Sequence, residues 1–348
     1  MKRRNLGQWI VGIVFLLALL PLIVTIATQI VANPQLFSQQ LFRGLVNGAI
    51  IAIVALGYTL VYGIVELINF AHGDVFMLGS FTALIIVGVL NVAGTAAAGV
   101  RIPVLVLTLV VAMVVTAGIN VAIERFTYRR LRSAPRLAPL ISAIGMSFIL
   151  QWVGLMLGNL NLPLDVMGNS PAASKNVPNL VSNQLLLEAP LRVTLKDGLV
   201  LVVSVLLMVG LYIFIQRTRV GKAMRATAQD RDAARLMGID VDRTIALAFL
   251  LGGALAGAAG MIAAFYFNSA VFNMGFTYGL RSFTAAVLGG IGNIPGAMLG
   301  GVLIGVLAAL SDQYISTRWT NAVVFAILVI ILVFRPSGLL GEDVVQKA

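Results

Sequence analysis

Cysteine is absent from this chain of 348 residues, and histidine occurs only once, as His72. Without cysteine there can be no disulfide and no thiolate ligand, and one imidazole cannot form a histidine metal cluster. Charged residues are scarce too, at 11% of the sequence. The composition therefore predicts neither a cross-linked framework nor a metal site.

The pattern G-x-x-x-x-G-K-[ST], which cradles nucleotide phosphates, is also missing. The nearest fragment, Gly221-Lys222-Ala223, lacks both the earlier glycine and the hydroxyl residue. Nor does the chain carry the series of intramembrane carboxylates or histidines that proton-coupled carriers use. The sequence thus predicts no enzyme activity, no catalytic residue and no cofactor, so any work that consumes ATP would depend on a partner that binds it.

Apolar residues are abundant instead. They make up 59% of the chain, and the mean hydropathy is +1.00. Lys and Arg outnumber Asp and Glu by 24 to 13, but the basic residues cluster between apolar runs and are not interleaved with aromatics as in a nucleic-acid surface. This pattern predicts an all-α polytopic membrane protein, in contact with lipid and not with nucleic acid.

Apolar runs of about 20 residues are long enough to cross the hydrocarbon core as helices. With two shorter pieces near the C-terminus, they predict about 9–10 transmembrane or re-entrant helices in one domain over 1–348. The runs are Trp9–Ile30, Leu41–Val65, Val75–Val92, Pro103–Ile123, Leu137–Leu157, Leu199–Ile215, Thr244–Phe267, Gly279–Ile291, Pro295–Leu310 and Thr320–Phe334.

Basic residues orient these spans by the positive-inside rule. They precede the first span, fill the loop after Ile123, and number seven in the polar island 217–243. Alternation places all three clusters, and both termini, in the cytoplasm, and it leaves segment 158–197 as an irregular external loop. The first 40 residues resemble a signal peptide, but the apolar run is long and its cleavage sites are poor, so we expect a retained extra helix.

The piece Gly279–Ile291 covers only about 20 Å as a helix, which is less than the hydrocarbon thickness of about 30 Å. Glycine and proline at Gly289, Gly290 and Pro295 predict a break in the helical ladder there. Irregular backbone at membrane depth must be covered by protein or line a water-filled path. Two interpretations follow. The irregular backbone lines the substrate path or the permease interface, or it is a tight turn between packed helices.

The island 217–243 predicts one short helix, capped by Asp230 and ended by Gly238. Asp232-Ala233-Ala234-x-x-x-Gly238 resembles the E-A-A-x-x-x-G loop with which ABC importer permeases dock onto their ATPases, although Asp replaces Glu and the usual Ile-x-Leu-Pro tail is missing. The resemblance implies ATPase-docking roles for Asp232, Ala233, Ala234 and Gly238. The other interpretation is an ordinary solvated loop.

Ionisable residues near membrane depth are few, and His72 and Asp74 sit together in the stretch Ile68–Asp74. One interpretation is structural, because Asp74 could cap the span that begins at Val75. The other is a gate at the cytoplasmic mouth, or part of the translocation path, formed by Asn69, His72 and Asp74.

Several ordered motifs resemble bacterial branched-chain amino acid ABC permeases of the H-type, and the likeness runs over 41–340. The first span lies outside the usual extent of this family, and Glu66 departs from its pattern. The motifs are Gly57–Ile64, Ile68–Asp74, Ile141–Ser147, Phe283–Gly292 and Ile294–Met298.

This resemblance implies a fold similar to the vitamin B12-type (type II) importers. It also implies an inner-membrane permease that works with an M-type permease subunit, two ATP-binding cassette subunits and an external substrate-binding protein. The expected function is import of leucine, isoleucine and valine by alternating access, with ATP bound by the partners. Urea or short amides are alternative substrates, and a secondary carrier or channel for small polar solutes is the alternative mechanism.

Overall fold

The computed structural model describes residues 24, 27–92, 94, 96–131, 134–135, 137–160, 162, 170–188, 191–335 and 337–341. Seven helices within these residues are long and apolar enough to cross a membrane. The prediction of a polytopic all-α membrane protein is therefore confirmed. The extra helix predicted over 9–30 lies almost entirely outside the described residues, as do Arg132 and Arg136 of the basic loop and both chain ends.

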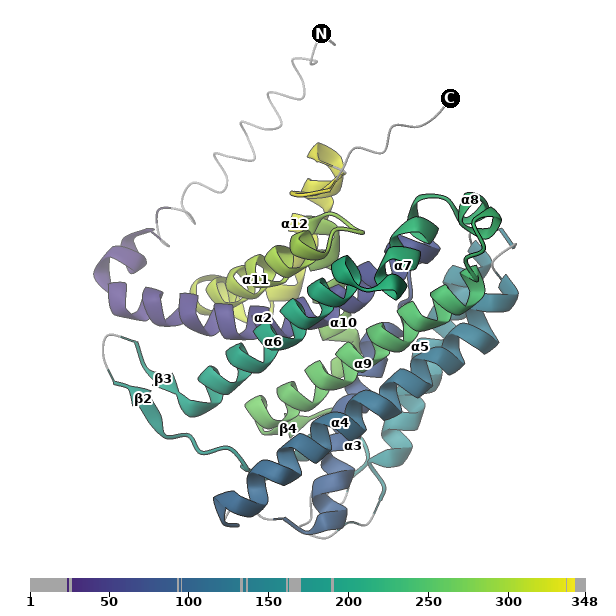
Figure 1. Ribbon diagram of the computed structural model, residues 1–348. Helices are drawn as coiled ribbons and strands as arrows, with labels where there is room; N and C mark the ends of the chain where they lie inside the picture. The colour runs from purple at the N-terminus through teal and green to yellow at the C-terminus, as the bar shows by residue number, and fades with distance from the viewer. Residues whose placement is uncertain are drawn as a thin grey trace.

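The long helices are joined mostly by short connections, except for the external segment between α5 and α6 and the polar island between α6 and α9 (Figure 1). They are α2 (Pro34–Val65), α3 (His72–Leu90), α4 (Ala98–Ile123), α5 (Leu137–Leu157), α6 (Leu195–Arg217), α9 (Val241–Phe267), α10 (Met274–Gly289), α11 (Ile294–Ser311) and α12 (Thr320–Phe334). Two further helices form the polar island, α7 (Arg219–Gln229) and α8 (Arg231–Leu236). Short π-helical and 3₁₀ turns follow α4 at Glu124–Tyr128 and Arg129–Leu131, and a π-helical turn follows α11 at Asp312–Ser316.

Two small antiparallel strand pairs lie at the end of the molecule opposite to α8 (Figure 1). β1 (Lys175–Asn176) pairs with β4 (Ser269–Ala270), and β2 (Leu185–Leu187) pairs with β3 (Val193–Thr194). Segment 158–197 is thus less irregular than predicted. It also loses its last residues to α6, which begins at Leu195 because Thr194 and Asp197 form a capping box.

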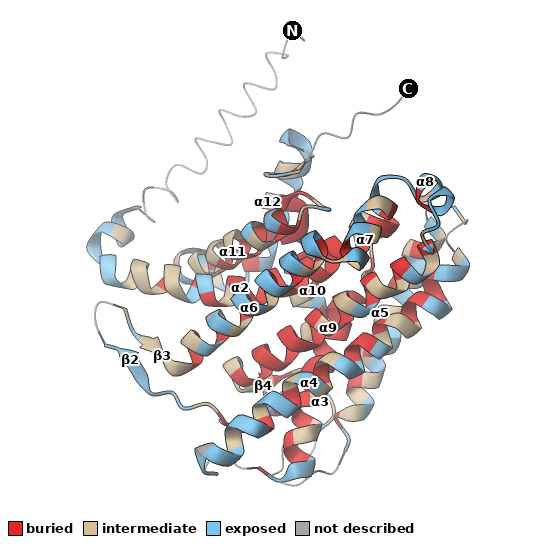
Figure 2. Ribbon diagram, viewed as in Figure 1, coloured by how far each residue is buried: buried red, intermediate tan, exposed pale blue. Residues whose placement is uncertain are grey.

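The core is built around α2, α3 and α9, whose apolar stretches are 89%, 72% and 78% buried, against 28%, 17% and 28% for α4, α5 and α6. Figure 2 shows α9 mostly buried at the centre and exposed residues along α4 and α6. Because an apolar side chain costs little free energy when it faces lipid, the exposed residues of α4, α5 and α6 mark the membrane-facing surface.

Glycines at four-residue spacing bring the helix backbones into direct contact. A Cβ added at Gly305 of α11 would lie 2.2 Å from the Cα atom of Gly48 on α2, and one added at Gly44 would lie 2.6 Å from Val306 Cα. Gly253 and Gly257 of α9 meet α4 in the same way. These glycines therefore serve close helix packing, as their spacing predicts.

The two basic clusters that the structure describes lie at the same end of the molecule. Arg129, from the loop after α4, forms a 2.8 Å ion pair with Asp242 at the start of α9, directly after the island. Two spans, α5 and α6, separate these clusters in the sequence. Their position at the same end of the molecule therefore agrees with the predicted topology.

Cysteine labelling can test this arrangement, since the parent chain has no cysteine to remove. Ala228 is exposed on α7, beside the first residues of α9, whereas the hydroxyl of Ser174 is 2.7 Å from that of Ser269, beyond the last residue of α9. We expect Ala228→Cys and Ser174→Cys to react with an impermeant maleimide from opposite sides of the membrane. Labelling of both variants from one side, in intact and inside-out vesicles alike, would refute the span count.

Candidate functional site

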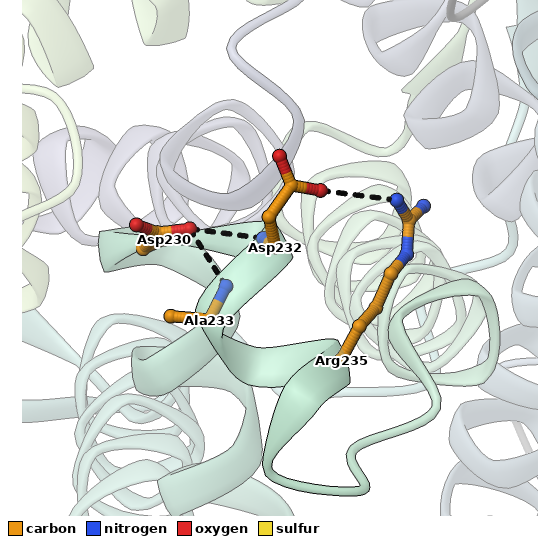
Figure 3. A network of polar contacts seen from close by, with 4 residues as sticks. All are labelled: Asp230, Asp232, Ala233 and Arg235. Atoms are coloured by element: carbon orange, nitrogen blue, oxygen red, sulfur yellow. Dashed lines mark hydrogen bonds and ion pairs between the residues drawn. The ribbon is translucent and has the colours of Figure 1, made fainter.

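The first part of the candidate site is helix α8 in the polar island. Its N-terminus is capped by the Asp230 carboxylate, which accepts hydrogen bonds of 2.9 Å from the backbone N–H groups of Asp232 and Ala233 (Figure 3). An exposed ion pair of 3.3 Å joins Asp232 to Arg235. The cap gives the helix its start, and the exposed pair adds little to stability.

The C-terminus of α8 is ended by a left-handed glycine. Gly238 has φ +81°, and its N–H donates to the carbonyl of Arg235 while that of Ile239 donates to Ala234. This pair of bonds satisfies carbonyls that the helix end leaves free. The prediction of a short helix between Asp230 and Gly238 is confirmed.

The predicted docking residues of α8 do not all face outward. Ala234 is buried at 3% exposure and packs against the protein body, whereas Asp232 and Ala233 are exposed. Sequence reasoning missed two large apolar side chains of this segment, Leu236 and Met237, which are 89% and 81% exposed. The available signal was the Leu-Met pair itself, two large apolar residues together in a segment that must face water.

Sequence reasoning also missed α7, an amphipathic helix that holds α8 against the membrane-spanning helices. Its N-cap is Thr218, whose hydroxyl accepts from Gly221 N–H at 3.0 Å, and its buried face carries Met224 and Thr227. From the first residue of α8, Arg231 donates a 2.9 Å hydrogen bond to the carbonyl of Ile64, near the end of α2. The island is therefore joined to a core helix by a direct contact.

The second part of the candidate site is the start of α3, and its depth differs from the prediction. A Cβ added at Gly57 of α2 would lie 2.3 Å from His72 Nε2, and one added at Gly252 of α9 would lie 3.3 Å from Gly57 O. Gly252 is the twelfth residue of α9, so this level is about 16 Å from the first residue of that helix. His72 thus lies in the middle of the span and not at the mouth, because residues 66–71 fold back into the protein.

Asn69 belongs to a fully connected network in that returning segment. Its amide donates to Asn120 Oδ1 at 3.4 Å, and its Oδ1 atom accepts from the hydroxyl of Tyr128 at 3.2 Å. Asn120 in turn donates to the carbonyl of Phe249 at 2.6 Å. These bonds tie the segment to α4, to the turn after it and to α9, so the contacts of Asn69 hold the backbone in place.

His72 and Asp74 have unpaired polar atoms, although each is only 1% exposed. Neither ring nitrogen of His72 nor Oδ1 of Asp74 makes a well-formed hydrogen bond with a described residue, although the backbone of Val54 lies within reach of the His72 ring. The other carboxylate oxygen of Asp74 accepts a bond from the hydroxyl of Ser147 on α5. A buried unpaired polar atom costs about 1–3 kcal/mol, so each of these atoms needs an explanation, such as a bound water or a role in transport.

Asp74 does not cap α3. The N-cap of the helix is Ala71, without a side-chain bond, and the Asp74 carboxylate faces α5 and Gly275 of α10. His72 faces α2 and stacks edge-on against the ring of Tyr58, with centroids 4.7 Å apart. Two positions along a helix differ by about 200°, so the two side chains point to opposite sides of α3.

The break near the C-terminus is a tight turn that joins α10 to α11. Gly289 packs against the backbone of Gly296, and Gly290, with φ +101°, packs against Gly341; Pro295 is in the first turn of α11. Gly275, beside Asp74, is at the other end of α10, about 21 Å from Gly289. The residues predicted for a path or gate therefore fall into two separate groups.

Comparison with known proteins matches residues 40–332 to the family described as branched-chain amino acid transport system / permease component. The high-affinity branched-chain amino acid transport system permease protein LivH of Escherichia coli K12 is 39% identical over 312 residues, 89% of this chain and 97% of that protein. BraD of Pseudomonas aeruginosa, described in the same words, is 40% identical over 316 residues, 89% of this chain and 98% of BraD.

A probable branched-chain amino acid transport permease protein LivH from the archaeon Methanocaldococcus jannaschii is 30% identical over 86% of this chain and 92% of its own length. No solved structure shows a significant match. The family match covers the core helices, the polar island and both parts of the candidate site. This chain is therefore a multi-pass membrane protein that belongs to the family of branched-chain amino acid transport permease components.

Proposed function

We propose that the chain is the permease subunit of an ATP-driven importer for leucine, isoleucine and valine, located in the cell inner membrane with both termini in the cytoplasm. The observation that carries the ATP-driven part is α8, a capped helix that exposes Leu236 and Met237 at 89% and 81% in a segment rich in charge. Large apolar side chains that face water are typical of a surface covered by a partner.

The partner that fits this surface is an ATPase subunit with an apolar pocket for the two side chains. A pair of permeases, this one and an M-type subunit, would offer two such helices to two ATP-binding cassette subunits. ATP would bind to these partners. An external binding protein would deliver the substrate on the opposite side, where the loop with β1, β2 and β3 lies.

Alternating access requires that motion of α8 reach the core, and the structure provides one contact for it. Arg231 joins α8 to the carbonyl of Ile64, two residues before Glu66 takes a left-handed conformation with φ 55°. The chain then returns through Asn69 to His72. A shift of α8 would act on this returning segment, at whose end His72 and Asp74 keep unpaired atoms for transient partners.

The substrate assignment rests on the names of the relatives, which are permeases for branched-chain amino acids in two bacteria and, in the probable case, an archaeon. Leucine, isoleucine and valine share the zwitterionic backbone and differ only in small apolar side chains. One permease path could thus serve all three, while selection against other amino acids would take place in the binding protein.

Reconstitution tests the proposal. The chain and its co-purifying subunits would be placed in proteoliposomes together with the cognate binding protein, and uptake of labelled leucine, valine and urea would be measured with ATP or ADP inside the ATPase-facing compartment. We expect leucine and valine to accumulate only with ATP and binding protein. Equal flux with ADP would indicate a carrier or channel, and ATP-dependent uptake of urea alone would refute the substrate.

A further inference from the structure

Two cavities adjoin each other at the end of the molecule opposite to α8. The larger, of about 480 Å³, is an apolar groove between α4 and α6 with α9 as its floor, and Arg101 lies at its rim. The smaller, of about 290 Å³, is polar and is lined among others by Arg43, Arg192 and Asp197. Lys196 and Tyr266 line both cavities, so the two form one amphipathic site.

The apolar groove opens sideways, toward lipid. Its floor residues Met261 and Phe265 are buried at 7% and 5% exposure, but its wall residues Ile102 and Val106 on α4 and Leu199 on α6 are 62%, 57% and 42% exposed. Along α4 the groove runs from Arg101 to Leu109, about 12 Å, which is most of a hydrocarbon leaflet of about 15 Å.

The polar cavity is electropositive. Arg43, Arg192 and Lys196 contribute three cationic groups against the single carboxylate of Asp197. That carboxylate is already bound by the N–H of Thr194 at 2.8 Å, by its hydroxyl at 2.6 Å and by Tyr266 at 2.9 Å. These neutral donors do not cancel its charge, so the three cations and one carboxylate leave an excess of two positive charges to attract an anion from outside.

Two basic residues of the site, one at the junction of the cavities and one at the rim of the groove, bond to neutral oxygens of the protein. Lys196 is only 6% exposed and bonds to the neutral amide oxygen of Asn268. Arg101 donates from Nη1 to the carbonyl of Leu180 at 3.3 Å, and its buried Nε atom has no partner in the described part of the chain. Lys196 is the second residue of α6 and Arg101 the fourth of α4, the depth at which phospholipid headgroups meet the hydrocarbon.

We propose that an anionic phospholipid occupies this site, with its phosphate beside Lys196 and one acyl chain in the groove between α4 and α6. The groove then supplies an apolar surface of leaflet depth, and the polar cavity supplies the charge complement of the headgroup. The bound lipid would cover the junction of α4, α6 and α9, a place where protein side chains leave a space open.

Native mass spectrometry of the chain, extracted in detergent with its associated subunits, tests this proposal with phosphatidylglycerol and phosphatidylcholine as probes. We expect wild type to retain phosphatidylglycerol at least tenfold more strongly than phosphatidylcholine. Lys196→Gln should reduce that preference to near unity, and Arg318→Gln, which changes an exposed arginine between α11 and α12 outside the site, should preserve it.

A second pair of variants tests the groove without changing charge, and it applies even where Lys196→Gln fails to fold. Val203 lines the groove, whereas its neighbour Val202 is 57% exposed and does not. Val203→Trp should lower retention of both lipids at least tenfold, and Val202→Trp should not. The proposal is overturned by equal retention of the two lipids in wild type, by Val203→Trp matching Val202→Trp, or by Val203→Trp releasing a protein subunit while lipid is retained.

Discussion

Leu236→Ser together with Met237→Ser is expected to abolish ATPase association and transport while leaving the membrane fold intact. Each side chain, if fully buried on docking, contributes about 1.5–3 kcal/mol. Replacing both side chains would therefore weaken association by about 10²- to 10⁴-fold, since each 1.4 kcal/mol corresponds to tenfold. Both residues are more than four-fifths exposed in the isolated chain, so the free energy of unfolding should change by no more than about 0.5 kcal/mol.

The measurement is recovery of the ATPase subunits by affinity-tagged permease, alongside leucine uptake. Ala228→Ser, an exposed change on α7, is the control and should recover the ATPase as wild type does.

Gly238→Val tests the same surface independently, because a Cβ there meets no atom within 4 Å and only the φ of +81° is strained. That strain costs on the order of 1–2 kcal/mol and would misdirect the chain after α8. If the double serine variant recovers the ATPase subunits as wild type does, α8 is part of an ordinary solvated loop and not a docking helix.

Asp74→Asn is expected to lower transport by about 10- to 100-fold without lowering stability. The amide keeps an oxygen for the hydroxyl of Ser147 and has the same shape, but it removes the charge. A hydrogen bond to a charged group contributes about 1.5–3 kcal/mol. The Oδ1 atom of Asp74 would offer this stabilisation to a polar group that binds it during the transport cycle. Removing a buried charge with one partner also removes a desolvation penalty, so the melting temperature should stay equal or rise.

Asp312→Asn is the matched control for this substitution. Asp312 also accepts a bond from one hydroxyl, that of Thr320, but it is exposed and lies directly after the last residue of α11. It should change neither transport nor melting temperature. A fall in melting temperature together with transport in Asp74→Asn would assign Asp74 a purely structural role, and unchanged transport would remove it from the mechanism.

Local chemistry explains why several features could be read directly from the chain. The cap at Asp230, the end of α8 at Gly238 and the break after α10 each depend on residues within about four positions of one another. The four-residue spacing of glycines on α2 and α11 is also a local pattern, and it allows close packing because a missing side chain permits contact whichever helix the partner is.

Other features depended on contacts between distant parts of the chain. Beyond residue 47 helix α2 is almost wholly apolar, so its pattern could not show that protein covers it while α5 faces lipid. The depth of His72 comes from contacts of Asn69 with Asn120 and Tyr128. The partner of Asp74 is 73 residues away. No local pattern records such contacts, because they form only when the helices pack.

The sequence by itself therefore determined that this chain is an apolar helical bundle with one capped helix in a polar island, because hydropathy and capping act within a single segment. Only the tertiary structure decided which face of that helix is free, that α3 begins in the middle of the span, and that Lys196 joins a polar cavity to an apolar groove. These three features depend on how separate segments approach one another, which is settled by side-chain packing over the whole molecule.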